Sequence, residues 1–164
     1  ALSGGTCFKV LPHTSGGMAR KGVIMAPSLH PANVWEAQVI ENFKRIQATL
    51  AKSPHLLRLG RLFSETVLIE VDGDEYYLSF EKGYITRIEQ GPSRKTPWRF
   101  ALRTDAEALS KFWQPRPEPG FHDIFGLVKI GRGRIDGDIL CLVKNLRFFK
   151  EVLGIARAQE DVSA

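Results

Sequence analysis

The residues best suited to acid–base chemistry are His122 and Asp123, the one place where a histidine stands beside a carboxylate in the chain. A positioned histidine is a common general base, but no serine lies in a Gly-x-Ser-x-Gly turn that would supply its nucleophile. The four histidines, His13, His30, His55 and His122, show no metal-ligand spacing. Gly131 and Gly133 begin like a phosphate-binding loop but lack the third glycine. We therefore expect no enzyme, no metal site and no cofactor, with an enzyme built on His122 and Asp123 as an open alternative.

The two cysteines, Cys7 and Cys141, lie far apart, and neither forms a Cys-x-x-Cys pair. Small secreted scaffolds use many more cysteines, so we expect a reducing compartment and a cytoplasmic protein. Cys141 lies within the apolar run 139–143, where cysteine usually behaves as a small buried hydrophobe rather than a reactive thiol. That run is the longest in the chain and falls far short of the roughly 20 residues that cross a bilayer. No signal-peptide pattern is present.

Charge is distributed unevenly along the chain, whose formal net charge is +5. Residues 61–90 hold three basic and seven acidic side chains, and residues 91–157 hold thirteen basic and seven acidic ones. A basic half suits nucleic acid, an anionic membrane or an acidic partner, and a solvated surface explains it equally well. Strand alternation places Trp98 on the face opposite Arg99 and Arg103, so base stacking and phosphate contacts would not share a surface. We therefore expect no nucleic-acid partner.

A helix is predicted from residue 33 onwards. Asn33 and Glu36 form a capping-box pair. Apolar residues then recur on one helical face, at Trp35, Val39, Phe43, Ile46 and Leu50, and Pro54 ends the segment. We expect residues 1–33 to be an N-terminal arm or partly an added segment, 34–158 a single domain, and 159–164 a tail.

Period-two alternation replaces the helical period after residue 63. Strands are predicted at 67–71, 76–81, 84–89 and 98–103, joined as an antiparallel meander. Thr104 or Asp105 caps a helix that runs to Trp113, and residues 120–131 are helical or mixed. A short strand then ends at Gly137, which needs a positive φ or a close backbone approach. Asp138 caps a last helix that runs to about residue 158.

Large apolar side chains are abundant in the second half of the chain. They indicate either a well-packed core or a sheet face and last helices that line a cavity for an apolar ligand. Because Phe148 and Phe149 are consecutive, we expect that they do not face one core, which slightly favours the cavity. The candidate lining residues are Leu78, Phe80, Trp98, Phe100, Leu102, Phe121, Phe125, Val128, Leu146, Phe149 and Leu153.

Three motifs follow one another after the meander: ALRTDAEAL (101–109), FGLVKIG (125–131) and RIDGD (134–138). They correspond to a strand entering a capped helix, a helical segment, and a turn before the last helix. In this order and spacing the chain resembles the sterol carrier protein type-2 domain family over about residues 34–157. The resemblance implies a tunnel for sterols, acyl chains or acyl-CoA and no catalytic residue. The family also includes ubiquinone-pathway accessory factors, so a polyprenyl quinone-type lipid is as good a ligand as a sterol.

We therefore expect an α+β fold, with a single mostly antiparallel β-sheet flanked by helices and enclosing a hydrophobic tunnel or cavity. The expected function is non-enzymatic binding and transfer of an apolar lipid. A protein-interaction or accessory scaffold with a solid core, for example in quinone biosynthesis, is the alternative. A carrier must meet a membrane, so we expect transient contact of the basic half with an anionic membrane surface. The basic side chains of that half include Arg94, Lys95, Lys129, Arg132, Arg134, Lys144, Arg147 and Lys150. Loss of Arg94, Lys95, Arg132 and Arg134 should slow transfer. The identity of the lipid and the oligomeric state stay open.

Overall fold

A computed structural model describes residues 31–157 of the chain. Of the predicted arm, only residues 31–33 fall within this range, and the predicted tail lies outside it. The strands are β1 (Thr66–Val71), β2 (Asp74–Glu81), β3 (Tyr84–Gln90), β4 (Phe100–Thr104) and β5 (Gly133–Gly137). The helices are α1 (Pro31–Ala51), α2 (Pro54–Gly60), α3 (Ala106–Phe112), α4 (Ile124–Lys129), α5 (Ile139–Lys144) and α6 (Leu146–Gly154).

The five strands form one sheet in the order β3-β2-β1-β4-β5. Three of the four neighbouring pairs are antiparallel, and β1 and β4 are parallel, with Val67 opposite Phe100. The prediction that β4 continues the meander is therefore wrong, because β4 lies beside β1 rather than β3. Burial explains the choice: Phe100, Ala101 and Leu102 are all buried, so β4 suits the centre of the sheet, whereas β3 is largely exposed and suits an edge.

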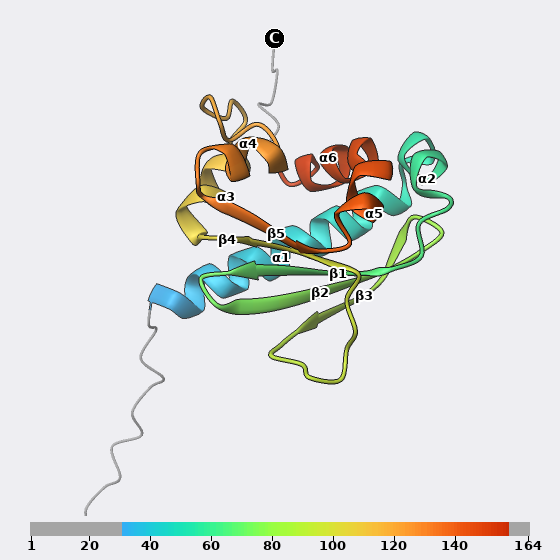
Figure 1. Ribbon diagram of the computed structural model, residues 1–164, viewed down its shortest axis with the longest axis horizontal. Helices are drawn as coiled ribbons and strands as arrows, with labels where there is room; N and C mark the ends of the chain where they lie inside the picture. The colour runs from blue at the N-terminus through green and yellow to red at the C-terminus, as the bar shows by residue number, and fades with distance from the viewer. Residues whose placement is uncertain (1–30, 158–164) are drawn as a thin grey trace, which may run out of the picture.

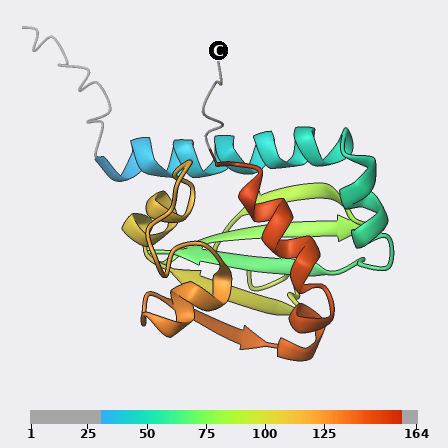
Figure 2. The ribbon, with the colours of Figure 1, turned by 90° about the horizontal axis from the view of Figure 1, so that it is seen from above.

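The helices all cover one side of the sheet, as Figures 1 and 2 show, and α1 runs alongside β3. The predicted apolar face of α1 is confirmed, since Val39, Phe43, Ile46 and Leu50 are fully buried. The helix begins at Pro31, a favourable first helical residue, so Asn33 lies inside the helix and the predicted start there is wrong. Gln47 Nε2 of α1 donates to the Ile85 carbonyl of β3 at 2.8 Å. The α+β class with a mostly antiparallel sheet is thus confirmed.

The face of the sheet away from the helices carries a second, smaller apolar cluster. Leu68, Tyr77 and Ala101 are buried there, and Trp98 packs against them. The prediction that Trp98 shares a face with Phe100 is wrong, because a bend at residue 99 interrupts the alternation before β4 begins.

The same bend places Trp98 on the face of Arg103, so the geometric argument against a shared basic and aromatic surface is also wrong. Arg103 is nevertheless engaged, since its guanidinium pairs with Glu70 of β1 and with Asp136 of β5, the latter at 2.6 Å.

Aspartates cap three of the short helices. Asp105 accepts from the Ala108 amide at 2.9 Å at the start of α3, and Asp123 accepts from Gly126 at 2.8 Å at the start of α4. Asp138 accepts from Cys141 at 2.9 Å at the start of α5, as predicted. The single last helix is a wrong prediction, because Asn145 separates α5 from α6. The Asn145 side-chain amide donates to the Cys141 carbonyl at 2.9 Å, a local bond that competes with helix continuation.

Gly137 confirms the expectation placed on it. Its φ is +88°, and a Cβ there would lie 2.7 Å from the Arg99 carbonyl oxygen and 3.0 Å from the Phe100 Cα. Gly131 also has a positive φ, +74°, but nothing lies within 4 Å of the position of its Cβ. The two glycines therefore separate the cost of backbone conformation from the cost of close approach.

We expect Gly137→Ala to lower the free energy of unfolding by about 3 kcal/mol or more, because backbone strain adds to an overpacking cost of ~1–3 kcal/mol. Gly131→Ala should cost only about 1 kcal/mol, from the strained backbone alone. Urea unfolding of the two variants measures the difference. Equal losses would show that the contact of Gly137 with the start of β4 is unimportant.

Candidate functional site

The interior between the sheet and the helices holds a small apolar void. Six of the predicted lining residues meet around it: Leu78, Phe80, Phe100, Leu102, Phe149 and Leu153. Four further residues complete the wall and were missed in the sequence: Val67, Ile69, Ile124 and Leu142. Alternation in β1 could have identified the first two. Every side chain of this wall is apolar, so the wall offers no hydrogen-bonding side chain and only hydrocarbon contacts.

A second void lies next to the first and shares part of its wall, namely Ile69, Leu102, Ile124 and Leu153. Each void measures about 10 Å³. That is no more than one water molecule needs, and apolar voids of this kind stay dry. Sites for small organic ligands usually occupy several hundred Å³. The interior is therefore filled by its own side chains, and the tunnel implied by the family resemblance is not confirmed.

Aromatic rings fill most of the space next to the first void. The Phe149 ring lies 4.9 Å from that of Phe63 and 5.1 Å from that of Phe100, both edge-on. Phe148 is buried as well and lies 5.9 Å from Phe80. The expectation that Phe148 and Phe149 face different surroundings is wrong, because α6 buries an arc wide enough for two consecutive positions. Consecutive phenylalanines are therefore no argument for a cavity.

Five predicted lining residues do not reach either void. Trp98 lies on the opposite face of the sheet. Phe121 is buried at the edge of the core, under the Lys111 ammonium at 5.2 Å. Phe125 and Leu146 are half-buried, and Val128 is 37% exposed. The predicted group was thus larger than the wall that the fold assembles.

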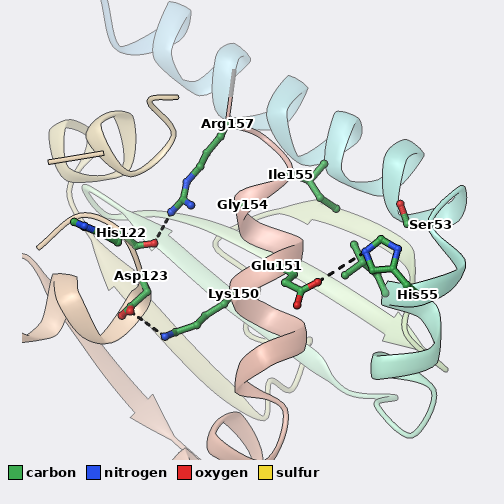
Figure 3. A pocket seen from close by; sticks show the side chains of 10 residues that line it. Ser53, His55, His122, Asp123, Lys150, Glu151, Gly154, Ile155 and Arg157 are labelled. Atoms are coloured by element: carbon green, nitrogen blue, oxygen red, sulfur yellow. Dashed lines mark hydrogen bonds and ion pairs between the residues drawn. The ribbon is translucent and has the colours of Figure 1, made fainter. Parts of the chain in front are cut away.

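A larger cleft of about 570 Å³, lined by both polar and apolar residues, opens along α6, between α2 and the start of α4 (Figure 3). Its basic side chains already have partners. Lys150 Nζ lies 2.9 Å from Asp123, and His55 lies 3.8 Å from Glu151. Arg157 donates to the carbonyls of Phe112, at 3.0 Å, and of His122. An anion entering this cleft would therefore have to displace existing partners.

His122 and Asp123 border this cleft, but their side chains do not act together. Figure 3 shows the imidazole directed away from the carboxylate, which faces Lys150. Burial opposes ionisation of Asp123, yet hydrogen bonds from Lys150 and the Gly126 amide outweigh it and lower its pKa. Asp123 is thus an ionised helix cap. Within residues 31–157, no hydrogen bond joins it to the His122 imidazole.

Cys141 lies half-buried in α5, where burial raises the pKa of its thiol. The interpretation as a small packed side chain fits this placement, because a reactive thiol needs a lowered pKa. Across the described part of the chain, no three His, Cys, Asp or Glu side chains gather as a metal site. Nor is any of the described helices long and apolar enough to span a membrane.

The basic side chains proposed for membrane contact are not equivalent. Arg132 pairs with both Asp105 and Glu107, at 2.6 and 2.9 Å, and this hydrogen bonding lowers the pKa of Asp105 to about 2. Arg134 lies 2.8 Å from Asp136. Arg94 and Lys95 are exposed in the loop between β3 and β4. The expectation that the basic half faces a membrane is therefore not supported for Arg132 and Arg134, whose charges are paired.

The fold of this chain is similar to that of several solved structures. A crystal structure of sterol carrier protein 2 matches with a TM-score of 0.58 and 12% identity, over 73% of this chain and 95% of that one. A conserved hypothetical protein from Thermus thermophilus matches with a TM-score of 0.58 and 13% identity, over 76% and 91%. The chain therefore has the sterol carrier protein 2 fold, and the resemblance seen in the three motifs is confirmed at the level of the fold.

A ubiquinone synthesis protein, UbiJ-SCP2, matches at 19% identity over 77% of this chain and 96% of that one. Its TM-score of 0.47 is too low to carry an argument. No family model and no curated protein matches the chain.

If Asp123 is a structural cap, Asp123→Ala should lower the free energy of unfolding by about 1–2 kcal/mol, through loss of the cap and of the Lys150 pair. His122→Ala should change it by less than about 0.5 kcal/mol, because that side chain is exposed. Asp123→Asn keeps an oxygen for the Gly126 amide and should fall between them. Urea unfolding tests all three, and equal behaviour of the Asp123 and His122 alanine variants would contradict the assignment.

Proposed function

We propose that this protein binds the apolar part of a lipid between its sheet and α4–α6 and carries it without chemical change. The candidate ligands are sterols, fatty acyl chains or acyl-CoA, and polyprenyl quinone-type lipids, and the expected setting is the cytoplasm. The observation that carries the proposal is the wall of the first void, which is wholly apolar and is drawn from β1, β2, β4, α4, α5 and α6. Similar solved structures include sterol carrier protein 2, which supports the same assignment.

Binding requires the interior to expand, since the voids measure only about 10 Å³ each. A chain of about 16 carbons gains roughly 12 kcal/mol when its methylenes are buried, at ~0.8 kcal/mol each. Association itself costs about 4–15 kcal/mol. Little is left for repacking the aromatic side chains, so affinity should be micromolar or weaker. Leu142 of α5 and Phe149 and Leu153 of α6 belong to the wall, so movement of these helices away from the sheet enlarges the site.

A protein-interaction or accessory scaffold is the second candidate, and the small size of the voids favours it. In that case the interior serves only stability, and the surface recognises a protein partner. The two candidates differ in one measurable property, because a scaffold retains no lipid when it is purified gently and examined by native mass spectrometry.

Enlarging the void should strengthen lipid binding. Leu78 lines it, whereas Leu68 faces the other side of the sheet, and each is 1% exposed. Leu78→Ala and Leu68→Ala should both destabilise the fold, by about 2–5 kcal/mol. Only Leu78→Ala lowers the cost of opening, so its affinity for NBD-labelled stearate should rise several-fold while that of Leu68→Ala stays at the wild-type value.

Fluorescence titration with competition by unlabelled oleate, cholesterol or a short-chain ubiquinone measures the effect. Thermal unfolding confirms that both variants are folded at the assay temperature. Absence of competitive probe binding in the wild type and in Leu78→Ala alike would reject the carrier proposal and favour the scaffold.

A further inference from the structure

The short helix α5 has two contrasting sides. Leu142 points inward, is 1% exposed and belongs to the wall of the first void. Ile139, Leu140 and Val143 point outward and are 50%, 61% and 49% exposed. Three large aliphatic side chains on six residues form an apolar patch with nothing over it among the described residues. The helix is thus a thin cover between the apolar interior and the outside.

Basic side chains adjoin this patch. Lys144, the last residue of α5, is exposed, and no carboxylate of residues 31–157 pairs with it. Arg147, at the start of α6, has a side chain that is 80% exposed, although Glu151 accepts from it at 3.0 Å. The acidic group nearest in sequence, Asp138, already caps α5 and lies 2.9 Å from Arg99. The patch therefore combines bare hydrocarbon with an available positive charge.

We propose that the outward side of α5 docks on an anionic lipid membrane. A small apolar surface beside cationic side chains suits the membrane interface, where the hydrocarbon enters the headgroup region and the cations meet acidic lipids. A stable protein interface usually needs about 800 Å² from each partner, and three half-exposed side chains supply far less. The proposal extends the proposed carrier function and rests on it, because docking would place α5, which lies over the proposed lipid site, against the membrane.

Vesicle sedimentation tests the docking directly, with phosphatidylcholine vesicles that contain or lack phosphatidylglycerol. Leu140→Gln should lower the partition coefficient about tenfold on the acidic vesicles, since an aliphatic side chain no longer enters the interface. Lys144→Gln should lower it about fivefold on the acidic vesicles and leave it unchanged on the neutral ones. Both side chains are exposed, so both variants should fold as the wild type does.

Val34→Gln is the matched control. Val34 is 59% exposed, close to the 61% of Leu140, but it lies in the first turns of α1, at the other end of the molecule in Figures 1 and 2. Its partition coefficient should equal that of the wild type. Equal binding by the Leu140 and Val34 variants, or no binding by the wild type, would overturn the docking proposal.

The same variants separate this proposal from the carrier function. Leu140→Gln should bind NBD-labelled stearate as the wild type does, because Leu140 does not line the void. Vesicle binding without any probe binding would reject the carrier and leave the docking surface standing. If Leu140→Gln instead abolishes self-association in analytical ultracentrifugation and leaves vesicle binding intact, the patch is an interface between two copies and the membrane assignment is wrong.

Discussion

The parallel contact between β1 and β4 is the constraint on which the rest of the structure depends. Each strand has three consecutive buried apolar residues, 67–69 in β1 and 100–102 in β4, and so buries side chains on both faces and needs a neighbour on both edges. Their pairing sets Val67 beside Phe100 and Ile69 beside Leu102, and these four side chains, with Leu78 and Phe80 of β2, line the apolar void on the side of the sheet. The helices that follow β4 are then obliged to cover these side chains. The candidate site is thus a product of sheet order rather than of any single motif.

The side chains between the sheet and the helices are apolar, as in a lipid-binding site, but they are packed as closely as in an ordinary protein core. Interlocking phenyl rings stabilise the closed state, and any ligand must offer enough hydrocarbon contact to replace their mutual contacts. The proposed opening would move α5 and α6, which Asn145 divides into two short helices where one long helix was expected. In a carrier of this kind, contacts between the ligand and the side chains would replace the contacts among the phenyl rings. Its rate of ligand binding would depend on how often the helices open.

Local signals in the sequence predicted much of the fold. The spacing of apolar residues identified α1, the turn residues separated β1 from β2 and β3, and the aspartate caps and Gly137 located the beginnings of helices. Contacts between segments far apart in the chain could not be predicted from such local signals. The position of β4 depends on competition between two sheet edges, and the face of Trp98 depends on a single bend. Six of the eleven predicted lining residues surround the first void, because strand alternation and the buried arc of α6 are local properties. The errors came from residues next to a bend or at the margin of the core.

The hydrogen bond from Gln47 to the Ile85 carbonyl helps to protect one edge of the sheet from pairing with strands of other molecules. It occupies an acceptor on the free edge of β3, along which α1 already runs. The other edge, β5, has only five residues, begins and ends with glycine, and carries the Arg134–Asp136 ion pair. Short, charged or covered edges are poor templates for strand addition from another chain. Opening of the helix layer to admit a ligand would therefore leave both sheet edges protected. The protein could open its interior and still resist aggregation through strand addition.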